Sequence, residues 1–418
     1  MRHDFLFTSE SVTEGHPDKL CDQIADAILD RFLQQDYLSR VSAECAVAGE
    51  VLFISSRFKS GGSVDIPEVA RQVIEQAGYD REDFNSKHCT VITSFTDMTD
   101  QSSFDEQDLS EKELDQITAK DNANVFGFAC TQTQVMLPLT LWLAHKLARR
   151  LSAVRRNGSL SYLVPDGKAQ VGVEFRKRRP HRIHSVTLVA GQYEEDSPSL
   201  ATFREDLYQH VIEPVFADEP LKPDDKTNIF INPEGALITG GPSLHSGLTG
   251  RKNAIDTYGE YSRHSGAALS GKDPTRVDRV GAYAARYAAK NIVAARLAEE
   301  CEVQLSYSMG LARPVSIQVH TFGTGEIPDE QIATRLKSSF DFRPAGIVSD
   351  FGLRHLPEKS EDGFFRRLAA YGHVGRSDMD LPLGDDGQSS FACVVPCESS
   401  QTSRIQVGTR FNLKLNFI

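Results

Sequence analysis

Four short clusters of the chain combine turn-forming residues with cations, and three of them also contain aspartate. The clusters are GHPDK (15–19), PDGK (165–168), GLTGRK (247–252) and GKDPTRVDR (271–279). Glycine lets a ligand approach the backbone closely, Lys and Arg neutralise phosphate oxygens, and Asp holds the Mg2+ that bridges such oxygens. Each cluster taken alone is typical of an ordinary turn or a helix cap. The four together predict a binding site for a polyphosphate.

The net charge of the 418-residue chain is −12 at pH 7, so a polyanionic ligand must meet a local group of cations. The same charge argues against nonspecific binding to nucleic acid or to a membrane surface, and we expect neither as a partner. No run of apolar residues is long enough for a signal peptide or a membrane span. The seven cysteines are scattered without a CxxC pair, which predicts reduced thiols, a cytoplasmic protein and no zinc site.

The first cluster lies where a helix is expected to begin. Apolar residues recur every four positions from Leu20 to Phe32, which predicts a helix with one apolar face and with Pro17 in its first turn. GHPD therefore stands at the N-terminus of this helix. The other elements predicted in the same unit are a hairpin (43–49 and 51–56), a helix (66–77) and a strand (90–93).

Two later segments repeat this combination of helices and strands, which predicts an α+β fold built of three similar subdomains. The second unit is expected to hold helices at 134–154 and 200–215 and strands at 171–175, 185–190 and 228–232. The third is expected to hold helices at 277–300 and 328–340 and strands at 303–308 and 316–322. The predicted domains are 1–125, 126–240 and 241–380, followed by a tail of unknown role at 381–418.

Residues 97–121 form a polar, acidic segment within the first unit. Such a segment is either a solvated excursion on the surface or a lid over an active site. Within it, Ser110 and Glu113 have the spacing of a capping box, which predicts the start of a short helix.

Several common enzyme classes lack support in the sequence. GAALSGKD (266–273) has the glycine and lysine spacing of a phosphate-binding loop, but Asp273 stands where Ser or Thr would hold Mg2+. The chain also lacks GxSxG and HExxH motifs, so neither a serine hydrolase nor a zinc protease is indicated. The polyphosphate hypothesis therefore depends on the four separate clusters.

Longer motifs around these clusters resemble the S-adenosylmethionine synthetase (methionine adenosyltransferase) family. The motifs are FTSESVTEGHPDK, FINPEG, SGLTGRK, SGKDPTRVDR followed by AYAARYAAKNIVAA, and AAYGHVGR. The resemblance spans roughly residues 5–376 and is weaker over 55–125. It implies three α+β subdomains about a pseudo-threefold axis, and a homodimer or homotetramer with active sites at the subunit interface.

The family reaction is attack by the sulfur of methionine on C5′ of ATP. This step expels tripolyphosphate, which is then cleaved to pyrophosphate and phosphate. A thioether needs no deprotonation, so catalysis requires alignment of the reacting atoms and stabilisation of the charge that builds on the phosphates. At a helix N-terminus, His16 would donate a hydrogen bond to the departing oxygen.

The resemblance also assigns roles to individual positions. The implied catalytic residues are His16, Lys168, Lys252, Lys272 and Arg276. The implied ligands of ATP and tripolyphosphate are these five with Glu10, Lys19, Asp121, Asp166, Phe230 and Arg251. Asp18 and Asp278 would bind two Mg2+ per site, and Glu44 would bind K+. Arg276 stands where the family usually has lysine, which keeps the charge but alters its reach.

The second-substrate pocket departs from the family pattern. The glutamate of a Gly-Gly-Glu stretch is replaced by Ser56 or Arg57, and an aspartate before the GLTGRK motif is replaced by His245. In the family these two acids hold the ammonium of methionine, and each is worth about 1 to 3 kcal/mol in a partly buried site. A glycine-rich loop has become TAKDNA (118–123), and Gln101 is a candidate for the glutamine that stacks on methionine.

Several functions therefore remain open. The chain either makes S-adenosylmethionine with a compensated pocket, or adenosylates another small sulfur compound that lacks an ammonium or carries extra negative charge. It could also have kept only tripolyphosphatase activity. A non-catalytic regulatory partner of a true synthetase is the alternative of a different class.

Overall fold

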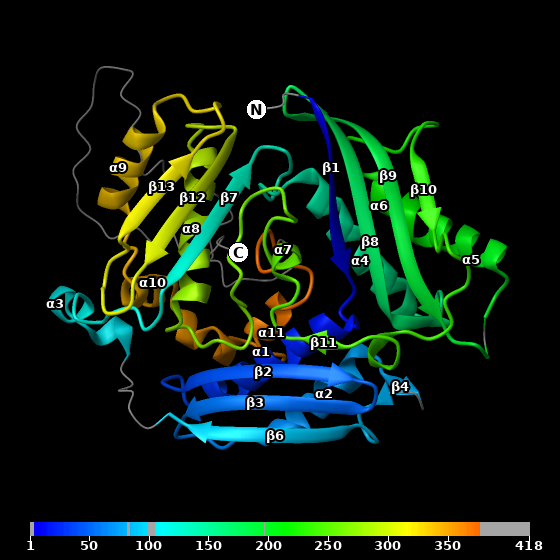
Figure 1. The fold of residues 1–418 in the computed structure, drawn as a ribbon, viewed down its shortest axis with the longest axis horizontal. Helices are drawn as coiled ribbons and strands as arrows, with labels where there is room; N and C mark the ends of the chain where they lie inside the picture. Colours follow the sequence, from blue (N-terminus) through cyan, green and yellow to red (C-terminus); the bar gives the residue numbers. More distant parts are fainter. Residues whose placement is uncertain (1–3, 82–83, 99–104, 196, 377–418) are drawn as a thin grey trace.

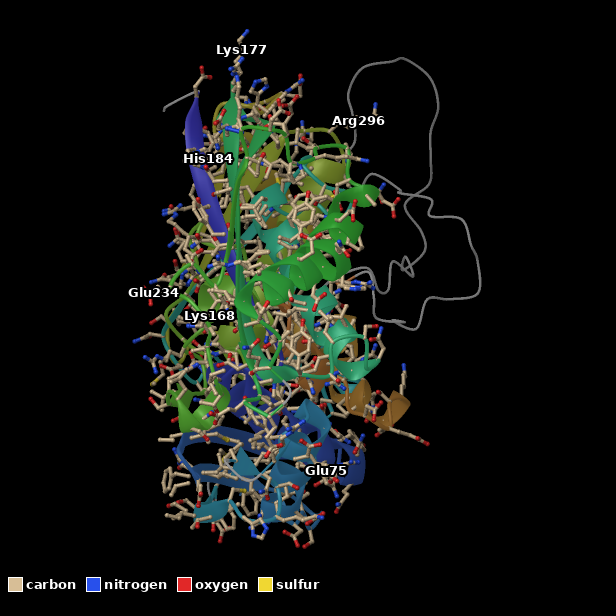
Figure 2. The ribbon with its side chains drawn as sticks, turned by 90° about the vertical axis from the view of Figure 1, so that its right-hand side faces the viewer. Glu75, Lys168, Lys177, His184, Glu234 and Arg296 are labelled. Atoms are coloured by element: carbon tan, nitrogen blue, oxygen red, sulfur yellow. The ribbon has the colours of Figure 1, made fainter. Side chains whose placement is uncertain are left out.

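The computed structural model describes residues 4–81, 84–98, 105–195 and 197–376. These residues form three sheets of three or four strands and a short two-stranded ribbon. Figure 1 shows the three sheets arranged around the centre of the molecule, where α7 (Asn253–Asp256) lies. In the view of Figure 2, β1 runs along one side of the molecule and the helices lie on the other. The molecule is therefore a layer of sheets covered by a layer of helices.

The first sheet has the strand order β11-β2-β3-β6 and packs on α1 and α2. Its elements are β11 (Gly247–Leu248), β2 (Arg40–Ala48), β3 (Val51–Lys59), β6 (Thr90–Asp97), α1 (Pro17–Gln35) and α2 (Ile66–Ala77). The predicted hairpin and both predicted helices are confirmed, and α2 has the predicted bounds. Asp65 caps α2, and Gly78 ends it in a left-handed conformation with φ 95°.

The second sheet has the strand order β1-β8-β9-β10. Its strands are β1 (Phe5–Val12), β8 (Leu163–Arg176), β9 (Arg179–Gln192) and β10 (Asn228–Ile231). The helices behind it are α4 (Leu139–Arg156), α5 (Leu200–Leu207), a π-helical turn (Tyr208–Ile212) and α6 (Glu213–Ala217). The helix predicted from 134 begins at Leu139, because Pro138 disfavours helical backbone in the residue before it.

The third sheet has the strand order β13-β12-β7 and packs on α8. Its elements are β13 (Ser316–His320), β12 (Glu300–Tyr307), β7 (Ala123–Cys130), α8 (Val277–Ala294), α9 (Asp329–Ser339) and α10 (Pro344–Phe351). The helix predicted to reach residue 300 ends at Ala294. Arg296 adopts φ 58°, and the backbone N–H of Leu297 donates to the carbonyl of Ile292, which is a Schellman end to the helix.

The three sheets exchange strands across the predicted domain boundaries. β1 pairs antiparallel with β8 of the second sheet, β7 pairs with β12 of the third, and β11 pairs with β2 of the first. Every sheet therefore contains one strand from another segment of the chain. Because these contacts link residues far apart in sequence, we expect the three units to fold together rather than separately.

The remaining elements are short. They are β4 (Asp80–Arg81), β5 (Phe84–Asn85), α3 (Glu111–Leu114), α11 (Phe365–Leu368) and 3-10 turns at Glu106–Asp108, Gly241–Ser243, Leu353–His355 and Pro357–Lys359. The predicted capping box is present at α3, where the Glu113 carboxylate accepts the backbone N–H of Ser110. Among the described residues, none of the helices combines the length and apolar character needed to cross a membrane. The predicted tail at 381–418 lies outside the described residues.

Candidate functional site

The first two motifs, GHPDK and PDGK, pack against each other at the N-terminus of α1. The Thr13 hydroxyl donates to the carbonyl of Pro165 at 2.7 Å, and the Thr13 N–H donates to the carbonyl of Gly167 at 2.9 Å. A Cβ atom on Gly15 would lie only 2.4 Å from the Pro165 carbonyl oxygen, so glycine is required there. The expectation that PDGK forms a tight turn is wrong, because these residues lie within β8, paired with β1 and β9.

The GLTGRK motif packs on the opposite side of the same helix start. The Leu248 N–H donates to Oδ1 of Asp18 at 3.0 Å. A Cβ atom on Gly247 would lie 2.2 Å from the carbonyl oxygen of Pro17. The chain can therefore come this close to the helix only with glycine at position 247. Three motifs that are distant in the sequence thus meet at one helix N-terminus, where backbone N–H groups and the helix dipole favour an anion.

His16 is the N-cap residue of α1 and is only 2% exposed. Its Nδ1 accepts the backbone N–H of Asp18 at 3.2 Å, which places the ring proton on Nε2. Burial lowers the pKa of His16 to about 3, and the nearby charges of Lys252 and Lys168 act in the same direction. The imidazole is therefore neutral at physiological pH and can donate a hydrogen bond from Nε2.

Charged groups from three strands and loops surround His16. Nζ of Lys252 lies 3.2 Å from Oε1 of Glu10 on β1, and Nη1 of Arg251 lies 3.8 Å from Oδ1 of Asp18. Lys168 is exposed on β8 and pairs across the sheet with Val12, close to the end of β1. Figure 2 shows Lys168 near the middle of the molecule, on the side away from the helices. The cations predicted to bind phosphate at this end of α1 are therefore neighbours in space.

His245 and Asp166 form a hydrogen-bonded pair beside His16. Nε2 of His245 lies 2.8 Å from Oδ2 of Asp166, which also accepts the N–H of Gly241 at 3.0 Å. The rings of His245 and His16 are 4.9 Å apart. Although burial alone would raise the pKa of Asp166, the hydrogen bond from His245 helps to hold it below its usual range. The residue predicted for the second-substrate pocket thus contacts one predicted for the nucleotide site.

The fourth motif, GKDPTRVDR, forms a second cluster farther along α1 and β2. Nζ of Lys272 lies 2.8 Å from Oδ2 of Asp278 in the first turn of α8, and Arg276 is the N-cap residue of that helix. Gly271 adopts φ 78° and lies against Ala43 of β2, which excludes a larger residue. Lys272 forms a β-bridge with Ser42. This cluster therefore contains one of the cations predicted to bind phosphate and one of the acids predicted to bind metal.

The register of the first sheet distinguishes the two residues that replace the family glutamate. Ser56 is fully buried on the face that packs on the helices, and its hydroxyl has no hydrogen-bond partner among the described residues. Arg57 is exposed on the opposite face, which we call the outer face, and it pairs with Ser42. Glu44, two residues after Ser42 on β2, is also exposed on the outer face. Arg57, and not Ser56, is thus the residue available to a ligand.

The two clusters do not meet within one chain. Gly247 of the His16 cluster pairs with Val47 of β2, whereas Lys272 bridges to Ser42 of the same strand. Five residues along a strand separate the two contacts by about 16 Å. Asp18 and Asp278, the predicted magnesium ligands, therefore belong to different clusters.

Three predicted site residues lie apart from both clusters or are not described. Asp121 precedes β7, where its carboxylate accepts the N–H of Asn122. Phe230 is 44% exposed on β10, at the edge of the second sheet. Gln101 lies outside the described residues. Nothing in the described part of the chain joins Asp121 or Phe230 to His16.

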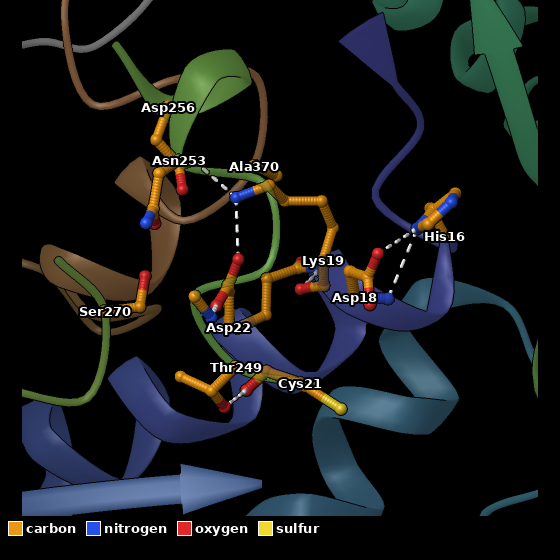
Figure 3. A network of polar contacts seen from close by, with 12 residues as sticks. His16, Asp18, Lys19, Cys21, Asp22, Thr249, Asn253, Asp256, Ser270 and Ala370 are labelled. Carbon is orange, nitrogen blue, oxygen red and sulfur yellow. Dashed lines mark hydrogen bonds and ion pairs between the residues drawn. The ribbon is translucent and has the colours of Figure 1, made fainter. Parts of the chain in front are cut away.

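Lys19 differs from the other predicted phosphate ligands because its side chain is fully buried. Its ammonium donates to Oδ2 of Asp22 at 2.7 Å and also to Oδ1 of Asp256, as Figure 3 shows. Burial opposes a charge on Lys19, but the two carboxylates raise its pKa above the usual value. Lys19 therefore ties α7 to α1 beneath the site, and its ammonium is buried and already paired with two carboxylates.

Sequence reasoning missed the buried ion pairs that hold the motifs in place. Asp256 joins Lys19 from α7, and Arg279 joins Asp26 with both partners fully buried. Asp22 had a usable signal, because it stands three residues after Lys19 on a predicted helix and so shares its face. Asp256 and Arg279 had none, since their partners are more than two hundred residues away.

The fold and these clusters define a three-unit α+β protein with loops suited to a polyphosphate. Models of the S-adenosylmethionine synthetase N-terminal, central and C-terminal domains match residues 4–103, 116–237 and 239–382. The S-adenosylmethionine synthase of Trichormus variabilis is 49% identical over 407 residues, covering 94% of this chain and 97% of the relative. The synthases of Trichodesmium erythraeum (46% identical; 91% and 94% covered) and Thermosynechococcus vestitus (47%; 90% and 94%) are similar. The chain belongs to the S-adenosylmethionine synthetase family, which confirms the predicted family and fold class.

Proposed function

We propose that this protein is a methionine adenosyltransferase that transfers the adenosyl group of ATP to a thioether sulfur, with methionine as the first candidate. The carbon–oxygen bond at C5′ breaks, a carbon–sulfur bond forms, and tripolyphosphate leaves and is cleaved to pyrophosphate and phosphate. The observation that carries the proposal is the convergence of GHPDK, PDGK and GLTGRK at the N-terminus of α1. Membership of a family whose curated relatives are named S-adenosylmethionine synthase supports it.

The His16 cluster provides groups for the leaving oxygen and the first phosphates. Neutral His16 donates from Nε2, while Lys168, Arg251 and Lys252 oppose the negative charge that builds as the bond to C5′ breaks. We assign Asp166 to the nucleoside portion, as the family resemblance implies. Because His16 and Asp166 are held by burial and hydrogen bonds before the substrate arrives, these two side chains need little reorganisation in the transition state.

Two hard cations fit the carboxylates of the clusters. Asp18 and Asp278 are only 3% and 5% exposed, and each lies beside a cation that a Mg2+–phosphate complex would displace or share. Such oxygen ligands suit Mg2+, which neutralises phosphate charge when bound. Glu44 is an exposed carboxylate on the outer face of the first sheet and suits K+ in the same way.

We further propose that a second copy of the chain completes the site. The outer face of the first sheet exposes four large apolar side chains, which are 41% to 48% accessible. They are Val51, Phe53, Ile92 and Leu248. Such a patch favours a protein–protein contact. A twofold axis through this face would bring the His16 cluster of one protomer to the Lys272 cluster of its partner, which overcomes the separation of about 16 Å along β2.

A second candidate substrate is favoured by Arg57 and His245. Both stand where the family resemblance implies carboxylates for the methionine ammonium. A cation at Arg57 repels an ammonium and attracts an acid, so the sulfur compound would lack a free amine or carry an additional negative group. The chemistry at phosphate and metal is unchanged in this version of the proposal.

The test is a product analysis with the full-length chain, ATP, Mg2+, K+ and methionine. The proposal predicts S-adenosylmethionine, pyrophosphate and phosphate in equal amounts. Accumulation of tripolyphosphate would contradict the cleavage step, and its hydrolysis without any adenosylated product would favour a tripolyphosphatase. Calorimetry with a non-hydrolysable ATP analogue separates the enzyme from a non-catalytic regulatory partner, since a scaffold has no need for Mg2+-dependent nucleotide binding.

A further inference from the structure

His16, Asp166 and His245 bring three potential metal ligands together from three parts of the chain. One ligand atom of each lies within 4.8 Å of the others. We propose that these three residues bind a transition-metal ion of the Zn2+ class, at a site separate in its ligands from the proposed Mg2+ and K+ sites. Two imidazoles and a carboxylate are ligands that Zn2+ prefers, and three protein ligands leave a fourth position open.

Each ligand is held by its own structural element. His16 is fixed as the N-cap of α1, and Asp166 lies in β8 with Oδ2 bound to the N–H of Gly241. His245 follows the 3-10 turn at Gly241–Ser243 and is 31% exposed at its side chain. Ligand atoms of a tetrahedral Zn2+ lie about 3.3 Å apart, so a small rotation of the partly exposed His245 ring would close the site. The same exposure gives an ion a path from solvent.

An independent feature of the site also points to a ligand. Oδ1 of Asp166 has no hydrogen-bond partner in the part of the chain that the structure describes, and the residue is only 7% exposed. Leaving a buried carboxylate oxygen unpaired is costly, and the other oxygen already accepts from His245 and Gly241. A metal ion bound by Asp166 would remove this cost.

The surroundings of His16 fit metal binding through Nε2. Its Nδ1 edge faces Asp18, with Oδ2 at 3.8 Å. When a metal takes the lone pair of Nε2, the ring proton moves to Nδ1, which then no longer accepts the N–H of Asp18 and donates to the Asp18 carboxylate instead. A carboxylate behind a metal-bound histidine is the usual way in which the ring orientation is fixed. The ring stays neutral, so no proton is released by the histidine.

Metal binding would use the same nitrogen that donates to the leaving oxygen in the proposed reaction. If the proposed function is right, the metal site is inhibitory, because a bound Zn2+ would exclude the nucleotide from His16 and Asp166. This part of the inference rests on the proposed function. The spacing of the cysteines predicts no zinc site built from cysteine, and the three ligands proposed here are two histidines and an aspartate. His245 stands where the family resemblance implies an aspartate, so we expect this set of ligands only where that position is a histidine.

The experiment uses metal-free, full-length protein titrated with Co2+, whose visible absorption reports tetrahedral coordination, and with Zn2+ in competition with a coloured chelator. Wild-type protein should bind one ion per chain with a tetrahedral Co2+ spectrum. His245→Ala should weaken binding at least tenfold, and Asp166→Asn should do the same while keeping the shape of the side chain. The matched control is His88→Ala at an exposed histidine, which should bind as the wild type does.

Circular dichroism melts show whether each variant is folded. Absence of the Co2+ spectrum in folded wild-type protein, or equal affinity in His245→Ala, would overturn the metal site. A second measurement follows Mg2+-dependent binding of an ATP analogue with and without Zn2+. If metal binds and nucleotide affinity is unchanged, the inhibitory role is wrong. If adenosyl transfer is observed and no metal binds, the inference fails while the proposed function stands.

Discussion

Arg57 and Lys272 lie on opposite sides of Ser42, since Arg57 pairs with Ser42 from β3 and Lys272 bridges to it from the loop before α8. Residues that pair directly across strands share a face of the sheet, so both cations belong to the outer face. Arg57 therefore lies on the face of the sheet from which we expect a ligand to approach Lys272. This arrangement makes the charge of the second substrate the most informative property to vary.

The double variant Arg57→Glu with His245→Asp should improve the use of methionine. It restores two carboxylates for the ammonium, each worth about 1 to 3 kcal/mol, so KM for methionine should fall at least tenfold. The measurement is S-adenosylmethionine formation across a range of methionine concentrations. Ser56→Glu is the matched control, because Ser56 faces the core and a charge there should destabilise the fold without improving KM. An unchanged KM in the double variant would count against the altered-pocket hypothesis.

Lys272→Ala should abolish most ATP turnover in protein that still folds. Its ammonium lies 2.8 Å from Asp278, with only 15% and 7% of the two side chains accessible, so the variant leaves a largely buried carboxylate unpaired and its unfolding must be measured alongside its activity. We expect kcat to fall by about 100-fold or more, as when other groups that stabilise transition-state charge are removed. Steady-state product formation measures this, with Lys177→Ala at the exposed tip of the β8–β9 hairpin as the control. Wild-type rates in Lys272→Ala would refute its assignment.

Lys19→Met should destabilise the protein rather than change nucleotide affinity. Removing the ammonium leaves Asp22 and Asp256 as uncompensated buried charges, a loss of about 3 to 5 kcal/mol. Urea unfolding of the variant, compared with Lys177→Met, gives the difference in free energy of unfolding. A variant with wild-type stability and lost ATP binding would instead restore the phosphate role predicted for Lys19 from the sequence.

The low pKa of His16 predicts a pH dependence of stability. The folded-state pKa of about 3 lies below the unfolded value, so between pH 6.5 and 3 the unfolded chain binds more protons than the folded one. Stability from this group is complete above pH 6.5 and is lost as the pH falls toward 3, by up to about 1.4 kcal/mol per pH unit. His16→Gln should flatten the slope of unfolding free energy against pH between 6.5 and 5. His88→Gln should keep the wild-type slope, and equal slopes in all three proteins would contradict the assignment.

Mixing two inactive variants tests whether the site spans two protomers. His16→Ala and Lys272→Ala should each be inactive, yet mixed dimers contain one site with both native residues, which gives about a quarter of the wild-type activity. Phe53→Lys in both chains should yield monomers by light scattering and abolish the recovery, whereas Tyr208→Lys on the helical side should not. A mixture without activity, from variants that do form dimers, would place the whole site in one chain.

Local patterns in the sequence were sufficient for the elements that carry the motifs. The helix bounds at Ile66–Ala77 follow from a capping Asp65 and a terminal Gly78, and the start of α1 follows from Pro17. Long-range pairing was not predictable in the same way. PDGK has turn composition, but β1 and β9 hold it as a strand, and no local signal marks such pairing.

The sequence motifs indicated which residues would lie near His16, but they gave no signal for partners far away in the chain. His16, Asp166 and Lys252 converge as the resemblance implies, because glycines in each motif permit close approach. Lys19 is a residue type that commonly binds phosphate, yet its ammonium forms an ion pair with Asp256, which lies 237 positions away in the sequence. Sequence spacing carries no information on that contact.

The most direct test of the central claim is mass spectrometry of the full-length protein incubated with ATP, Mg2+, K+ and a panel of thioethers that includes methionine and analogues without the amine or with an added carboxylate. The claim predicts a sulfonium product that carries the adenosyl group from at least one thioether, formed together with pyrophosphate and phosphate and lost in Lys272→Ala. Folded protein that yields no adenosylated product from any thioether would contradict it.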